Sequence, residues 1–357
     1  MNHKSPVARV VIGILCCCAC NTHAGIRPSF FVDESAWQAT HIVVVSEGEK
    51  LDGKCVVLES WKGDLETNST VFIPELAAFE SQEAREIRRW PNEPEVSPSH
   101  VTCSRIVLFL KRSASDGSKW EPTGIAKAMN VSMAWVEQGK MFAIVQRMNP
   151  GPSELVPLVQ TEAAFKTRVL ESVQTQDALA KTETIHDLNQ RAESLRPFVT
   201  NKLWYARGDA FTRLGKCGEP ALPVLRSMLS DTNLSAQHDA VISTLGHAGG
   251  TKVGAVTLNI LQDEIKFWKQ RAPKLGIGWW NGAGLSWHEA ESLRNHYTKV
   301  KAALAVLRDL NYRDSKTAVT ELRDFWRSLP QLEDRSGINQ MSEGCDEILK
   351  EFQEQTP

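Results

Sequence analysis

The chain has 357 residues, of which 42% are hydrophobic and 24% charged, and its formal net charge is −2. The 11 tryptophans and 12 phenylalanines argue against an intrinsically disordered protein, because disordered chains lack the aromatic side chains that build a core. A sequence pI of about 6.5 argues against a nucleic-acid partner, which needs a basic surface. At about 100–200 residues per domain, the length predicts two domains.

Residues 1–24 have the pattern of a secretory signal peptide. Two basic residues precede an apolar run over 10–20, which is shorter than the about 20 residues that span a bilayer. Small residues before Gly25 offer a cleavage site. The segment predicts an exported protein (periplasmic, extracellular or envelope-associated). An alternative is a lipid anchor at Cys20. No later apolar stretch is long enough to predict a transmembrane span.

Four of the eight cysteines follow this segment: Cys55, Cys103, Cys217 and Cys345. An oxidising compartment allows three connectivities among four cysteines. Cys55 and Cys103 fall in the same expected domain, so they are the first candidates for a disulfide. The alternative is that all four are buried thiols.

The first expected domain, 25–150, is β-rich. Runs of β-branched residues bounded by turn residues predict short strands with one helix between them. The expected strands cover 41–47, 54–61, 70–74, 105–111, 131–136 and 141–146, and the helix covers 75–90. Five or six short strands with one inserted helix predict a small closed or nearly closed β-barrel.

The second expected domain, 151–357, is all-α. A cluster of Pro, Gly and Asn at 149–153 marks the boundary, and beyond it the apolar residues recur with a helical period. The expected helices cover 160–173, 176–195, 202–215, 220–230, 235–247, 253–270, 287–310, 315–328 and 341–354.

A repeat is visible inside this helical part. Leu214-Gly215 followed by Gly218 recurs as Leu245-Gly246 followed by Gly249, and a weaker third copy covers 304–322 after an insertion at about 270–298. Each unit predicts two helices joined by a glycine-containing turn. One such pair cannot bury its apolar face alone, so neighbouring pairs must stack.

The residues of this repeat resemble a HEAT repeat, with a first helix, a Leu-Gly turn and a Pro-containing second helix. The resemblance covers 206–268 and, more weakly, 300–328, and the second copy lacks the proline. Its anchors in the first copy are Ala210, Leu214, Gly215, Gly218, Ala221, Leu222, Pro223, Leu225 and Leu229. The resemblance implies an α-solenoid scaffold and brings no catalytic residues with it.

The β-rich part has a fainter resemblance to exported domains of the netrin/TIMP-like, OB-barrel type. The matching features are a Val-rich strand at 43–45, a strand at 56–58 that leads into Trp61-Lys62-Gly63, and a later strand at 106–110. Metalloprotease inhibition in the TIMP branch depends on a cysteine at the mature N-terminus. Cleavage before Gly25 would leave none, so the resemblance does not imply that activity.

A Gly/Trp-rich insertion near 275–287 interrupts the helical repeat. It interleaves four glycines with Trp279, Trp280 and Trp287. Exposed Trp rings could stack on a sugar or anchor a protein partner, which makes these three residues the candidate ligand-binding residues. The alternative is that the rings cap the solenoid core.

Two histidines near this insertion invite a metal interpretation, but their spacing argues against it. A helical zinc site needs histidines four residues apart, and the residue four after His288 is Ser292. His296 lies two helical turns beyond His288, about 12 Å away by helical rise. We therefore predict two solvated histidines and no metal site. No phosphate-binding loop or nucleophile elbow is present, so no cofactor is predicted.

Together these patterns predict an exported, non-catalytic binding or scaffold protein that presents a helical-repeat surface to a protein partner. One alternative is binding of a carbohydrate or envelope polymer through the Trp-rich loop. Another is a hydrolase with a dispersed site near the domain junction, since such a site leaves no local motif.

Overall fold

The computed structural model describes residues 31–47, 53–74, 105–114, 116–117, 119–123, 133–137, 139–147, 154–275, 284–329 and 337–354. The chain divides into two compact units, Met1–Gln176 and Asp177–Pro357. The expected signal peptide and the expected helix at 75–90 lie outside the described residues.

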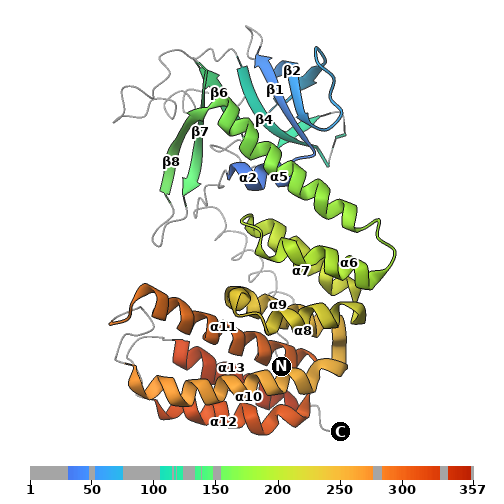
Figure 1. Ribbon diagram of the computed structural model, residues 1–357. Helices are drawn as coiled ribbons and strands as arrows, with labels where there is room; N and C mark the ends of the chain where they lie inside the picture. The colour runs from blue at the N-terminus through green and yellow to red at the C-terminus, as the bar shows by residue number, and fades with distance from the viewer. Residues whose placement is uncertain are drawn as a thin grey trace, which may run out of the picture. The chain divides into compact units, whose positions relative to one another are not determined.

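The first unit is built on one antiparallel sheet. Its order is β3-β2-β1-β4-β6-β7-β8, and β5 pairs with β4. The strands are β1 (His41–Glu47), β2 (Lys54–Lys62), β3 (Thr70–Phe72), β4 (Arg105–Arg112), β5 (Trp120–Pro122), β6 (Met133–Glu137), β7 (Lys140–Arg147) and β8 (Glu154–Thr161). The sheet curls into a half-barrel (Figure 1), and β3 and β8 are the first and last strands in its order. The predicted strands are confirmed, and the predicted closed or nearly closed barrel is a half-barrel in the structure.

The two central strands are apolar on both faces, which explains why they appear in the sequence as continuous apolar runs. Alternate side chains of β1 and β4 enter different cores. Ile42 and Phe109 belong to a cluster with Phe165 of α5 (Glu162–Thr182). Val43 and Leu108 belong to a second cluster on the opposite face. The curled sheet therefore supports two apolar cores.

The Lys-Gly pair at the end of β2 holds a short helix, α2 (Val32–Gln38), in place. Lys62 Nζ donates to the Ala36 carbonyl oxygen at 2.9 Å and to Gln176 Oε1 at 2.7 Å. Gly63 has a positive φ of 86°, and a β-carbon there would lie 2.2 Å from the His41 ring. The lysine therefore satisfies carbonyls at the C-terminal end of α2, and only glycine fits the turn that follows.

The first unit extends beyond the expected boundary at residue 150. The breaker cluster at 149–153 lies between β7 and β8, which pair over their whole length. Pro157 sits in β8 opposite Ile144, and it is tolerated because β8 is an edge strand. The apolar pattern of 154–161 contains this proline, so the sequence did not predict the strand.

The second unit is helical. Its elements are α6 (Leu188–Leu195), η1 (Arg196–Thr200), α7 (Trp204–Cys217), η2 (Glu219–Ala221), α8 (Leu222–Leu229), η3 (Thr232–Gln237), α9 (His238–Gly249), η4 (Gly250–Val253), α10 (Gly254–Arg271), η5 (Ala272–Lys274), α11 (Trp287–Asp309), η7 (Arg313–Ser315), α12 (Lys316–Ser328) and α13 (Gly337–Glu354). The expected single helix at 176–195 is divided: α5 ends at Thr182, and the Asp187 side chain caps the start of α6 by accepting from Asn189 N at 2.8 Å.

Three successive helix pairs, α7/α8, α9/α10 and α11/α12, each contain a short 3-10 turn between their helices. The first helices of the pairs contact one another in the order α7, α9, α11 (Figure 1). We call this row of helices the first-helix layer. The turns begin with positive-φ residues, Gly218, Gly250 and Asn311. The second turn therefore uses Gly250 rather than the expected Gly249.

The core of this unit lies between the later helices. Trp268 of α10 and Trp326 of α12 are fully buried, with ring centroids 5.2 Å apart. Tyr297 of α11 and Cys345 of α13 belong to the same apolar cluster. Among the helices that the structure describes, none has both the length and the apolar character required to cross a membrane.

Candidate binding sites on the helical unit

Of the three tryptophans predicted to bind a ligand, only Trp287 lies within the described residues. It is the first residue of α11 and is 70% exposed. Its ring packs edge-on against the His288 ring, with centroids 5.4 Å apart. The alternative that the Trp rings cap the solenoid core is therefore wrong for Trp287, whose ring faces solvent.

The start of α11 is held by a capping box. Ser286 Oγ accepts from Glu289 N at 3.3 Å, and Glu289 Oε2 accepts from Ser286 N at 3.1 Å. The Ser286 hydroxyl also donates to Glu289 Oε2 at 2.9 Å, and this bond, together with the one from Ser286 N, lowers the pKa of Glu289 below its ordinary value. Arg271 adds a smaller effect in the same direction. Trp287 and His288 therefore project from a fixed helix end rather than from a loose loop.

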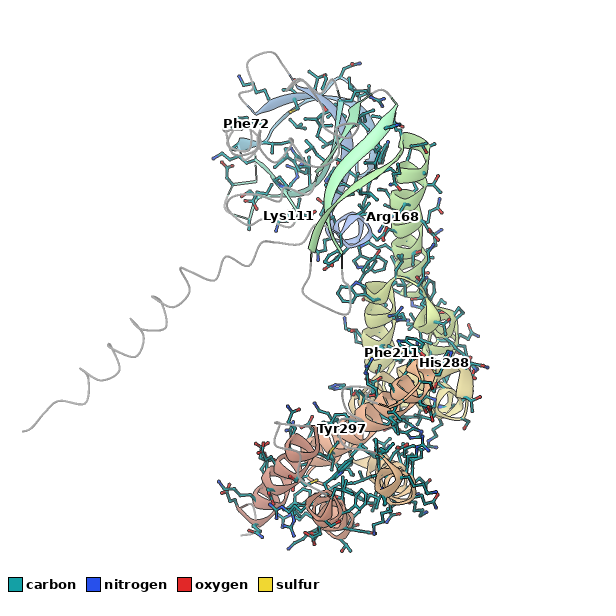
Figure 2. All side chains as sticks on the ribbon, turned by 90° about the vertical axis from the view of Figure 1, so that its left-hand side faces the viewer. Phe72, Lys111, Arg168, Phe211, His288 and Tyr297 are labelled. Atoms are coloured by element: carbon teal, nitrogen blue, oxygen red, sulfur yellow. The ribbon has the colours of Figure 1, made fainter. Side chains whose placement is uncertain are left out.

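A polar groove runs along one face of α11. It has a volume of about 270 Å³, and η3 forms its other wall. We call it the α11 groove; it is lined by Ser235, Ala236, His288, Glu291, Ser292, Asn295, His296 and Lys299. The α11 residues recur at intervals of three and four, which places them on one helix face. Figure 2 shows His288 at the start of this helix.

A buried carboxylate holds two of the lining residues of the α11 groove in place. Glu264 of α10 is 5% exposed and accepts from His296 Nδ1 and from Lys299 Nζ, both at 2.7 Å. The His296 ring also stacks on Phe267, with centroids 3.6 Å apart and planes 12° apart. The prediction of two solvated histidines is therefore wrong for His296, while His288 is exposed. Glu264 was not predicted from the sequence, because it lies 32 residues from its histidine.

Another histidine, His238, follows directly after η3, the other wall of the groove. Its Nε2 lies 3.2 Å from the Met228 carbonyl oxygen and 3.1 Å from that of Asp231. Burial lowers the pKa of His238, and the positive charge of Lys299 lowers it further. Because both neighbours of Nε2 are carbonyl acceptors, this nitrogen carries the proton. The lowered pKa keeps the ring neutral near pH 7, and its hydrogen bond connects α9 to the segment before η3.

A larger, mainly apolar groove lies between α7 and α9. It has a volume of about 540 Å³, and we call it the α7/α9 groove. Its lining residues are Gly208, Phe211, Thr212, Gly215, Lys216, Ala240, Ser243, Thr244 and His247. Phe211 is the largest apolar side chain among them and is mostly buried, at 9% exposure; Figure 2 labels it on α7. Small side chains on both helices leave the groove open.

The glycine of each Leu-Gly pair lies inside a helix and faces the next helix of the layer, rather than forming the expected turn. A β-carbon on Gly215 of α7 would meet His247 and Thr244 of α9 at ordinary contact distances. A β-carbon on Gly246 of α9 would lie 2.8 Å from both methyl groups of Val306 in α11. The two glycines thus occupy corresponding places between successive first helices.

The cysteines of the helical unit are buried thiols. Burial raises the pKa of Cys217, and burial together with the nearby Asp346 carboxylate raises the pKa of Cys345 to about 12. Cys55 is buried in the sheet, and Cys103 lies outside the described residues, so the Cys55–Cys103 disulfide stays a prediction. The described residues contain no cluster of three side chains suited to hold a metal ion.

No protein-family model, curated protein or solved structure matches this chain. The candidate sites are therefore defined by their own geometry.

Proposed function

We propose that the chain is a non-catalytic binding protein whose first-helix layer presents the α7/α9 groove to a protein partner. The observation that carries this proposal is the groove itself, an open and mainly apolar hollow of about 540 Å³ between two helices of the layer. Helix pairs that stack side by side build extended binding surfaces of this kind.

We further propose that the three helix pairs are HEAT-like repeats. The matching places of Gly215 and Gly246, each facing the next first helix, support this reading. Glycine at this place lets two first helices approach closely. The turns at Gly218 and Gly250 have similar backbone angles, with ψ of −145° and −139°.

The partner segment we propose is an amphipathic helix with a carboxylate next to its apolar face. Gly208 and Gly215 leave room for a helix to approach α7, and Phe211 offers it an apolar surface. Lys216 and His247 supply positive charge or hydrogen-bond donors at the edge of the groove, and both are exposed. Among the described residues Lys216 has no ion-pair partner. A helix in a groove with complementary charge is a common mode of peptide recognition.

The experiment is a selection of displayed helical peptides, with and without acidic residues, on the full chain. Binding of the enriched peptides is then compared between Gly208→Leu and Gly344→Leu. A β-carbon meets nothing within 4 Å at either glycine, but only Gly208 lines the groove. We expect the selection to enrich apolar peptides that carry a carboxylate. Compared with the unchanged chain, Gly208→Leu should bind them at least about tenfold more weakly, whereas Gly344→Leu should bind them equally well. No enrichment, or equal binding to both variants, would overturn it.

Export remains part of this proposal, with residues 1–24 as a cleaved signal and the β-rich unit as an OB-like domain of the netrin/TIMP type. The half-barrel and the Lys62–Gly63 turn are compatible with such a domain. Mass spectrometry of the chain recovered from an expressing bacterium tests the signal. A mature chain that begins at Gly25 supports it, a lipidated Cys20 supports the anchor instead, and an intact Met1 argues against both.

A further inference from the structure

We propose that the α11 groove is a second binding site, independent of the α7/α9 groove, and that it takes one ring of an uncharged saccharide. Its volume of about 270 Å³ lies just below the roughly 300–1,000 Å³ typical of pockets for drug-sized ligands. The groove therefore suits a single small ring, with the rest of an oligosaccharide lying outside it.

The side chains of the groove offer donors and acceptors together. Ser292 and Asn295 can both donate and accept, Glu291 accepts, and Lys299 donates. A small anion would meet the Glu291 carboxylate, and a small cation would meet Lys299. Hydroxyl groups of a sugar both donate and accept, so they can satisfy this mixed set without burying an unpaired charge.

Glu264 holds two of these groups in place before any ligand arrives. It fixes His296 through Nδ1, and the stack on Phe267 fixes the plane of the ring. Among the described residues His296 Nε2 has no hydrogen-bond partner, so this nitrogen can face a ligand hydroxyl. The Lys299 ammonium donates one hydrogen bond to Glu264, and its other N–H groups can donate to a ligand. Such fixed polar groups reduce the cost of ordering the site on binding.

Trp287 supplies an apolar face at the end of the groove. Trp287 is not itself a lining residue, but its ring packs edge-on against the ring of His288, which lines the groove, so the indole lies next to the groove. The apolar C–H face of a sugar packs well on an exposed aromatic ring. A polar groove with one exposed Trp next to it is therefore complementary to the two surfaces of a sugar, its hydroxyl edge and its C–H face.

The chain contains a matched control for Trp287. Trp204 also begins a helix, is 59% exposed, and packs edge-on against the next residue, Tyr205, with centroids 5.8 Å apart. It does not line the α11 groove. Replacing either tryptophan by alanine removes an exposed indole from the first position of a helix, but only Trp287→Ala removes the indole next to the groove.

The experiment is a titration of the full chain with soluble gluco-, xylo-, manno- and chito-oligosaccharides. Binding is measured by saturation-transfer NMR and by calorimetry. We expect saturable binding of at least one saccharide. Trp287→Ala and Asn295→Ala should each weaken it at least about tenfold, while Trp204→Ala should leave it within about twofold. The thermal unfolding of each variant is measured alongside, so that loss of fold is distinguished from loss of the site.

Three outcomes would overturn the proposal. These are the absence of saturable binding in the panel, binding that Trp287→Ala and Asn295→Ala leave unchanged, and binding of inorganic phosphate that displaces every saccharide. Failure of this experiment leaves the peptide selection on the α7/α9 groove unaffected, because the two grooves share no lining residue.

Discussion

Gly246 in α9 lies directly against Val306 in α11, so closely that a β-carbon on residue 246 would come within 2.8 Å of both valine methyl groups. This approach sets how tightly the second and third helix pairs pack. Gly208 in α7 is the opposite case, because a β-carbon there meets nothing within 4 Å.

Alanine at these two glycines should therefore change stability in opposite directions. We expect Gly246→Ala to lower the free energy of unfolding by about 1–3 kcal/mol, the usual cost of overpacking a core. Gly208→Ala should raise it by up to about 1 kcal/mol, because alanine favours the helix and has room. Urea denaturation measures both. If both substitutions changed the free energy of unfolding equally, the contact between Gly246 and Val306 would be less tight than the structure shows.

The buried ion pair of the α11 groove should stabilise the unit more than an exposed pair does. Replacing Glu264 by Gln leaves Lys299 and His296 without their carboxylate, and we expect a loss of about 1–3 kcal/mol. The control is Glu321→Gln, which breaks the exposed pair between Glu321 and Lys269 at 2.7 Å. Exposed pairs contribute about 0–1 kcal/mol. A cost for Glu264→Gln no larger than that of Glu321→Gln would contradict the described network.

Stability should fall in mild acid because of His238. Burial holds its pKa in the folded state below the ordinary value of 6.5, so the unfolded chain takes up the proton first as the pH falls. Its contribution is complete above about pH 6.5 and is lost as the pH falls from there toward the folded pKa. We expect His238→Gln to reduce the drop in unfolding free energy between about pH 8 and about pH 5. An unchanged drop would mean that other groups cause the acid sensitivity.

Cys345 should be unreactive in the folded chain. Its pKa is raised to about 12, so almost no thiolate is present near neutral pH, and its side chain is fully buried. We expect iodoacetamide to spare Cys345 and Cys217 in the native protein and to label both in urea, as read by mass spectrometry. Rapid labelling of Cys345 in the native protein would show that its thiol is accessible, which would contradict the packing of α13 described above.

The sequence predicted those elements whose pattern is local. β1 and β4 are uninterrupted apolar runs, and α11 has a helical period with Ser286 at its N-cap. β8 was missed because Pro157 interrupts its pattern, although an edge strand tolerates it. The degree of closure of the barrel was left open between closed and nearly closed, because strand count alone does not decide whether the end strands pair.

The two grooves could not be predicted because they depend on contacts between distant residues. His296 looks like a solvated histidine in the sequence, and only the packing of α10 on α11 brings Glu264 to it. Gly208 and Ala240 are unremarkable small residues until α7 and α9 lie side by side. Trp287 was a candidate from the sequence because a tryptophan near several glycines is unusual, and the structure adds that its ring is exposed.

Binding of the partner by the first-helix layer can be measured by hydrogen–deuterium exchange of the full chain, with and without a selected acidic amphipathic peptide. We expect slower exchange in α7 and α9 around Phe211 and Ser243, with little change in α12 or α13. Slower exchange confined to the β-sheet unit, or to α12 and α13, would contradict binding by this layer.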